Sequence, residues 1–235
     1  MAIVACNTIR VCLRVAIDDL FSNMRGMRFL LATASGVFLL TFLVGPRAGA
    51  GWFWDSGNAL GFAAFAGMLC LTVTGSRRTE LKAHQSLGYV VLLITAAHAF
   101  WFLLGDSVTA TYLEPGAPLY MWVGVLALVL LGVSVSAALM PDRLRVHRNY
   151  GTFRKWHLAI AILALLAALY HVIASNFYVD SGIEALLLVG LTAGIAFGRS
   201  SLRQWFHPGT ATIAVYVGTS IALSVVFVLI RNLPS

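Results

Sequence analysis

The chain has 235 residues, of which 60% are hydrophobic and only 11% are charged. Soluble domains carry roughly a quarter charged residues, and a soluble fold of this length could not bury so much apolar surface. The composition therefore excludes a soluble protein and indicates an integral membrane protein. The net charge of +7 does not point to nucleic acid as a partner, because the basic residues lie in short segments between apolar runs.

Seven apolar segments follow one another and predict membrane-spanning helices, since about 20 apolar residues cross the hydrocarbon core. The predicted helices are Phe29–Val44, Gly57–Thr74, His84–Leu104, Leu119–Leu139, Trp156–Ser175, Gly182–Phe197 and Thr210–Ile230. Residues 1–28 mix charged with apolar residues and predict an interfacial segment before the first helix. We therefore expect an all-α integral membrane protein with six helices in residues 29–198, followed by a loop and a seventh helix in residues 199–235.

The charged residues between the helices predict how the chain is oriented in the membrane. Basic residues dominate the N-terminal arm and the second–third, fourth–fifth and sixth–seventh loops. The alternate loops hold the acidic residues Asp55, Asp106, Glu114, Asp180 and Glu184. Because basic loops stay on the cytoplasmic side, we expect a multi-pass protein with a cytoplasmic N-terminus, located in the bacterial inner membrane.

Four of the six histidines lie in predicted helices, where ionisable residues are rare and usually functional. His84 and His98 are 14 residues apart in the third helix, and His157 and His171 are 14 residues apart in the fifth. At about 100° per residue each pair shares one helix face, separated by about 21 Å along the axis. Both helices cross the membrane in the same direction, so His84 should lie opposite His157 near the inner side. His98 should lie opposite His171 near the outer side.

Two imidazoles on opposite sides of a porphyrin iron are the ligands of a b-type heme, so the two pairs predict two hemes. Arg77, Arg78, Arg154 and Lys155 lie near the inner ligands and are candidate partners for the heme propionates. A zinc site would need its ligands within about one helical turn of depth, which the spacing of the histidines does not provide. The alternative is a membrane anchor or assembly subunit without redox activity, whose histidines only pack against neighbouring helices.

Two motifs in the sequence resemble a known family. His84-x13-His98 and Arg154-Lys155-Trp156-His157-x13-His171 are similar to the paired-histidine signature of the ferric-reductase-like transmembrane domain. That superfamily includes the membrane cores of ferric reductases and NADPH oxidases, and the heme subunit of the bacterial periplasmic methionine-sulfoxide reductase system. The resemblance covers residues 57–197. It implies a six-helix core, two b hemes held by the third and fifth helices, and electron flow from the cytoplasmic side to the outer side.

The chain departs from the larger members because no flavin- and nicotinamide-binding domain follows the helices. The resemblance therefore implies an oxidoreductase component whose electrons come from a cytosolic flavin reductase, a bound FMN or FAD, or a quinol in the lipid bilayer. The acceptor on the outer face would be a protein, ferric iron or dioxygen. A heme-bearing subunit that uses a flavin, or holds only one heme, is a further alternative.

Overall fold

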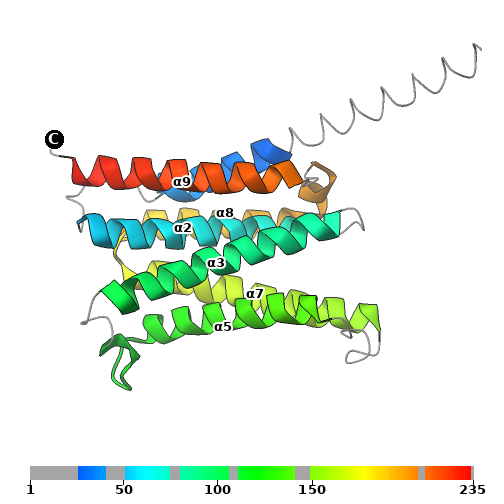
Figure 1. Cartoon of the computed structure of the whole chain (residues 1–235), viewed down its shortest axis with the longest axis horizontal. Coiled ribbons are helices and arrows are strands. Elements are labelled where there is room, and N and C mark those ends of the chain that lie inside the picture. Colours follow the sequence, from blue (N-terminus) through cyan, green and yellow to red (C-terminus); the bar gives the residue numbers. More distant parts are fainter. Residues whose placement is uncertain are drawn as a thin grey trace, which may run out of the picture.

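The computed structural model describes residues 26–40, 51–74, 80–105, 111–140, 149–205 and 210–233. Over these residues the regular structure is entirely helical (Figure 1). The helices are Gly26–Leu40, α2 (Trp52–Val73), α3 (Leu81–Gly105), the short 3-10 helix η2 (Thr111–Leu113), α5 (Leu119–Leu139), α7 (Tyr150–Ser175), α8 (Gly182–Trp205) and α9 (Thr210–Asn232).

Within the described residues, six helices are long and apolar enough to cross a membrane, namely α2, α3, α5, α7, α8 and α9. This confirms the all-α, multi-pass membrane fold. The first predicted helix is described only as the shorter apolar helix Gly26–Leu40, and the rest of its predicted range lies outside the described residues. Residues 1–25 of the predicted interfacial segment also lie outside the described residues. Helix α5 coincides with its predicted range, whereas α8 continues past the predicted end to Trp205.

Several polar residues at the helix starts belong to the helices rather than to the loops. Asn149 caps α7, because its side chain accepts a hydrogen bond of 2.7 Å from the Thr152 N–H. The charge pattern assigned Asp55 to an outer loop, and this was wrong, because Asp55 lies buried in the first turn of α2. Glu184 lies buried in the first turn of α8, within its predicted helix. Glu184 accepts bonds from two backbone N–H groups, and Ser181 accepts from the Glu184 N–H, which forms a capping box.

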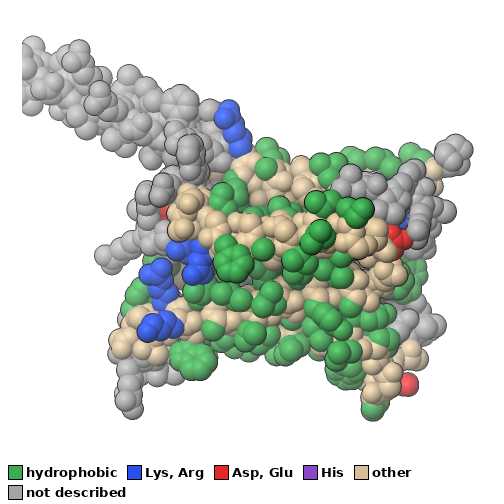
Figure 2. Space-filling view, turned by 180° about the vertical axis from the view of Figure 1, so that it is seen from behind, with side chains coloured by type: hydrophobic (Ala, Val, Ile, Leu, Met, Phe, Trp, Pro, Cys, Tyr) green, Lys and Arg blue, Asp and Glu red, His purple; other side chains and the backbone are tan. Residues whose placement is uncertain are grey.

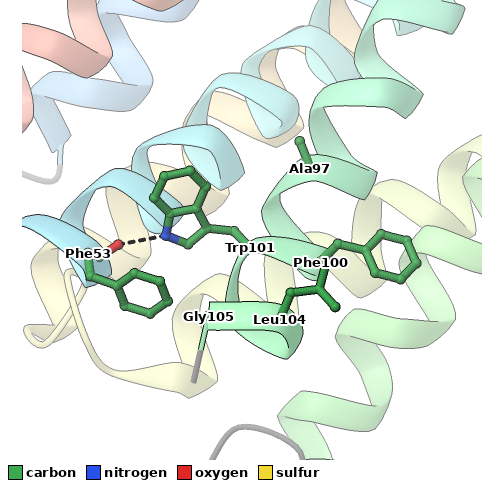
Figure 3. A pocket seen from close by; sticks show the side chains of 6 residues that line it. All are labelled: Phe53, Ala97, Phe100, Trp101, Leu104 and Gly105. Carbon is green, nitrogen blue, oxygen red and sulfur yellow. Dashed lines mark hydrogen bonds between the residues drawn. The ribbon is translucent and has the colours of Figure 1, made fainter. Parts of the chain in front are cut away.

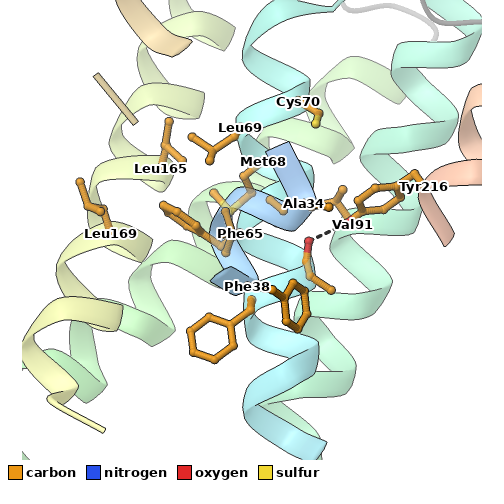
Figure 4. Packing of buried hydrophobic residues seen from close by; sticks show 14 of the residues in the cluster. Ala34, Phe38, Phe65, Met68, Leu69, Cys70, Val91, Leu165, Leu169 and Tyr216 are labelled. Atoms are coloured by element: carbon orange, nitrogen blue, oxygen red, sulfur yellow. Dashed lines mark hydrogen bonds between the residues drawn. The ribbon is translucent and has the colours of Figure 1, made fainter. Parts of the chain in front are cut away.

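Helix α2 forms the centre of the bundle. It packs against α3, α7, α8 and α9, and most of its apolar stretch is buried inside the protein. Figure 4 shows Phe65, Met68 and Leu69 of α2 in the same buried cluster as Leu165 and Leu169 of α7. The surrounding helices expose many large apolar side chains, as expected for surfaces in contact with lipid. Helix α2 is apolar on all sides, which is typical of a helix that other helices enclose.

The two ends of the bundle differ in their charge. We call the end where α2 ends and α3 begins the inner end, because it carries the predicted cytoplasmic loops, and the opposite end the outer end. Figure 2 shows Lys and Arg side chains gathered at the inner end, and hydrophobic side chains over the face between the two ends.

A buried polar network at the outer end holds α9 against α2. The Asp55 carboxylate accepts hydrogen bonds of 2.7 Å from the Tyr178 hydroxyl and from the Asn232 side-chain amide. Arg231 Nε lies 3.4 Å from the same carboxylate, and the guanidinium lies over the Tyr178 ring. Burial raises the pKa of Tyr178, and its bond to Asp55 raises that pKa further. The seventh helix is therefore fixed to the core by the chain's own residues.

Candidate functional site

Two pairs of histidine side chains face each other between α3 and α7. The ring centres of His84 and His157 are 6.1 Å apart near the inner end, and those of His98 and His171 are 6.4 Å apart near the outer end. Helices α3 and α7 share no close backbone contact, whereas α2 packs on α3 and α5 packs on α7. The structure thus brings together the two pairs that the helix spacing predicted, across the space that separates the two helices.

The separation within each pair fits one metal ion held between two imidazoles. A bond from a metal to a histidine nitrogen is about 2.0 Å and the ring centre lies about 1.1 Å further on, so two axial imidazoles have ring centres about 6.2 Å apart. Both observed separations lie close to this value. Among the described residues no group of three or more His, Cys, Asp or Glu side chains could hold a metal ion. A heme iron with two axial imidazoles would need only two protein ligands, whereas a structural zinc site takes four.

In the outer pair, backbone carbonyl groups hold both Nδ1 atoms. Nδ1 of His98 lies 2.7 Å from the Gly57 carbonyl oxygen of α2, and Nδ1 of His171 lies 2.8 Å from the Tyr120 carbonyl oxygen of α5. A carbonyl oxygen only accepts hydrogen bonds, so Nδ1 carries the proton and the lone pair is on Nε2. Histidines that bind metals usually donate their second ring N–H in this way, because the bond fixes the tautomer and the ring orientation.

In the inner pair, side-chain hydroxyl groups take the place of the carbonyl groups. Nδ1 of His84 lies 2.6 Å from Thr74 Oγ1, and Nδ1 of His157 lies 3.1 Å from Ser134 Oγ. The Phe153 ring stacks on the His157 ring, with centres 5.5 Å apart. None of the four Nδ1 partners was predicted from the sequence. The two carbonyl partners leave no trace in the sequence, and the hydroxyl partners become visible only once the helices are packed.

Two glycines give the outer imidazoles the space that they occupy. A Cβ atom on Gly61 of α2 would lie 2.9 Å from Cε1 of His98, and one on Gly124 of α5 would lie 2.7 Å from Nδ1 of His171. Cβ atoms essentially never come so close to another heavy atom. Each ring therefore lies directly against a helix backbone. Gly57 and Gly61 are one turn apart, a pattern typical of close helix packing, and the structure shows that the Gly61 position accommodates a histidine ring.

The cationic residues at the inner end lie on more than one helix. Four of them were predicted to bind heme propionates, namely Arg77, Arg78, Arg154 and Lys155. Arg77 and Arg78 lie outside the described residues, while Arg154 and Lys155 are exposed in the first turns of α7. The structure adds Arg203 of α8, whose Nε–H donates to the Val73 carbonyl oxygen at the end of α2 at 3.3 Å. This placement could not be predicted from the sequence, because Arg203 lies far along the chain from both histidines of the inner pair.

An apolar groove lies at the outer end, between the start of α2 and the end of α3 (Figure 3). It is lined by Phe53, Ala97, Phe100, Trp101, Leu104 and Gly105. The indole N–H of Trp101 donates to the Phe53 carbonyl oxygen at 2.9 Å, so the polar atom of this lining side chain is already bonded. Phe100, Trp101 and Leu104 are exposed. These properties are typical of aromatic residues at a membrane interface.

Six spanning helices with two histidine pairs between α3 and α7 define a multi-pass membrane protein with paired imidazoles near each end. Residues 58–168 match the family model of the ferric reductase like transmembrane component. The chain therefore carries a ferric-reductase-like transmembrane domain, which confirms the family predicted from the histidine spacing. The matched residues include His84, His98 and His157, and His171 lies just beyond them. No curated protein and no solved structure shows a significant match to the chain. The family indicates electron transfer at a membrane as the general function.

Proposed function

We propose that the chain carries electrons across the membrane by means of two b-type hemes, one held by His84 and His157 and the other by His98 and His171. The ring-centre separations of 6.1 and 6.4 Å carry this proposal, because they fit two imidazoles on one iron. Each heme, when bound, would supply a one-electron carrier. The resemblance of the two motifs to the ferric-reductase-like signature points to the same cofactor.

The chain's own groups would hold and orient these cofactors. The two carbonyl partners in the outer pair keep the lone pair of each imidazole on Nε2, where it can bind iron. The two hydroxyl partners in the inner pair hold the imidazoles in position. Imidazoles on both axial positions leave no open position for dioxygen, so an acceptor would be reduced by outer-sphere electron transfer. Since the pairs lie about 21 Å apart along helices that cross a core of about 30 Å, each lies near one membrane face.

We propose that electrons enter at the inner end and leave at the outer end. The basic side chains at the inner end support this orientation through the positive-inside rule, and Arg154, Lys155 and Arg203 are suited to bind anionic propionate groups. A cytosolic flavin reductase and a quinol from the bilayer are the candidate donors, with a flavin bound by the chain as a third. A protein, ferric iron or dioxygen is the candidate acceptor.

A membrane anchor without redox activity is the second candidate function. The same Nδ1 hydrogen bonds would then serve only to pack α3 on α2 and α7 on α5. This candidate and the electron-transfer proposal differ in one property that is easily measured, because an anchor would be colourless.

The test is a reduced-minus-oxidised absorption spectrum of the full chain purified in detergent, with heme quantified per chain. We expect about two b-type hemes per chain in the wild-type protein. His98→Ala and His157→Ala should each lose one heme, whereas the control His147→Ala, which changes a histidine outside the helices predicted from the sequence, should keep both. A single heme in the wild-type protein would remove one pair from the proposal, and a colourless protein would refute it.

A further inference from the structure

The two histidine pairs differ in the chemistry of their Nδ1 partners. The outer pair donates to backbone carbonyl oxygens of Gly57 and Tyr120, which no side-chain substitution can remove. The inner pair instead lies against two side-chain hydroxyl groups, on Thr74 and Ser134. The inner partners, unlike the outer ones, can therefore be removed by substitution of a single side chain.

Thr74 is placed to accept a proton from His84 rather than to donate one. It follows α2 directly as the C-cap residue, and its Oγ1 lies 2.6 Å from Nδ1 of His84. The same hydroxyl donates its only proton to the Leu71 carbonyl oxygen at 3.1 Å. With that proton engaged, the hydroxyl oxygen is available to accept the Nδ1–H of His84. Thr74 is only 4% exposed, so bulk water does not compete for this bond.

Ser134 provides the corresponding contact from the other side of the site. It is buried in α5, and its Oγ lies 3.1 Å from Nδ1 of His157 on α7. Helix α5 is otherwise almost wholly apolar, so a buried hydroxyl there is costly unless it is hydrogen-bonded. The two hydroxyl groups thus reach the inner pair from α2 and from α5, the same two helices that supply the carbonyl groups of the outer pair.

We propose that Thr74 and Ser134 are positioning residues of the inner heme site, whose hydroxyl oxygens accept the Nδ1–H of His84 and of His157. This inference rests on the proposed function, because it requires the inner pair to bind heme iron. By accepting the Nδ1–H, each hydroxyl fixes Nε2 as the ligand nitrogen and makes the imidazole a stronger electron donor. A stronger donor stabilises ferric iron more than ferrous iron. The two hydroxyl groups therefore lower the potential of the inner heme and leave the outer heme unchanged.

The test measures the inner heme alone. The parent protein is the full chain with His171→Ala, which should retain one heme, at the inner pair. Thr74→Val and Ser134→Ala are introduced separately into this parent, and the midpoint potential is followed by optical redox titration together with heme per chain. We expect each substitution to favour the reduced form about tenfold, which raises the one-electron potential by about 59 mV. Neither substitution should move the potential of the outer heme in a parent that carries His84→Ala.

Each variant has a matched control on the same helix. Thr72 donates its hydroxyl to the Leu69 carbonyl oxygen at 2.7 Å, as Thr74 does to Leu71, but it makes no hydrogen bond to a histidine within the described part of the chain. Thr72→Val therefore removes the same kind of bond to the backbone and should leave the potential unchanged. Ser136→Ala, at an exposed position of α5, is the control for Ser134→Ala.

The outcomes separate the inference from the proposed function. Unchanged potentials in Thr74→Val and Ser134→Ala would overturn the inference, and so would an equal shift in Thr72→Val. If Thr74→Val loses its heme, Thr74→Ser decides the question, because it keeps the hydroxyl. Heme retained at the parent potential in Thr74→Ser supports the inference, and heme loss there overturns it. A wild-type chain without heme would instead refute the proposed function itself.

Discussion

Replacing Gly124 by alanine adds one methyl group beside the His171 ring. In the present structure that Cβ atom would lie 2.7 Å from Nδ1, 2.9 Å from Cε1 and 3.0 Å from Cγ of His171. Ordinary van der Waals contact begins at 3.4 Å, so the ring would have to retreat by about 0.7 Å. The retreat would strain or break the 2.8 Å bond from Nδ1 to the Tyr120 carbonyl oxygen, which lies one turn earlier on the same helix.

We expect Gly124→Ala to lose the outer heme and to keep the inner one. Loss of a bond that orients a metal-binding histidine typically costs 10–100-fold in metal affinity, and the displaced ring adds to that loss. Heme per chain should therefore fall from about two toward one, as measured in the purified protein by absorption spectroscopy. The His84 and His157 rings lie near the other end of the bundle, so the inner site should be unaffected.

Gly132 provides the control, because it lies on the same helix and a Cβ atom there would meet nothing within 4 Å. Alanine is favoured over glycine in a helix by roughly 0.5–1 kcal/mol, so Gly132→Ala should keep both hemes and unfold at the same or a higher temperature. If Gly124→Ala binds two hemes with an unchanged spectrum, the close approach of ring and backbone does not position the outer ligand. The reasoning from the glycine contact would then be wrong.

Two further predictions concern the network that holds α9. Asp55→Asn leaves the buried Arg231 without its counter-ion and should destabilise the protein by about 3–5 kcal/mol, seen as a lower unfolding temperature in detergent. The double variant with Arg231→Gln should recover part of that loss, and a double variant as unstable as Asp55→Asn would argue against the ion pair. The raised pKa of Tyr178 means that the folded state prefers the protonated phenol. Its contribution to stability should be complete below about pH 10 and decline as the pH rises further. A Tyr178→Phe variant should lose this alkaline step in a series of thermal unfolding curves.

The sequence was sufficient for the helices and for the choice of ligands. Apolar runs of membrane length predicted six of the observed spans to within a few residues at most ends. The prediction works because every backbone N–H and C=O group inside a bilayer must be hydrogen-bonded within the protein, and a helix satisfies this by itself. The interval between His84 and His98, repeated between His157 and His171, places each pair on one face by helix geometry alone. The direction of each helix followed from counting the spans. It was therefore also possible to predict which histidine of α3 lies at the same depth as which histidine of α7.

The errors arose where a polar group has its partner far away in the chain. Asp55 was assigned to an outer loop because the predicted second helix began only at Gly57. In the structure it lies within α2, and its charge is balanced by Arg231 and its oxygens are bonded by Tyr178 and Asn232. No local pattern predicts these contacts, since they join residues more than a hundred positions apart.

The sequence alone was enough to predict a helical membrane protein that carries a ferric-reductase-like transmembrane domain, and to predict which four histidines face one another in pairs. Only the tertiary structure decided how those imidazoles are held. The Gly57 carbonyl of α2 and the Thr74 hydroxyl that follows α2 contact the histidines of α3, while α5 supplies the partners for those of α7. The physical reason is that periodicity fixes where a side chain lies on its own helix. The neighbour that its second nitrogen meets depends instead on which helices pack side by side, and at what depth.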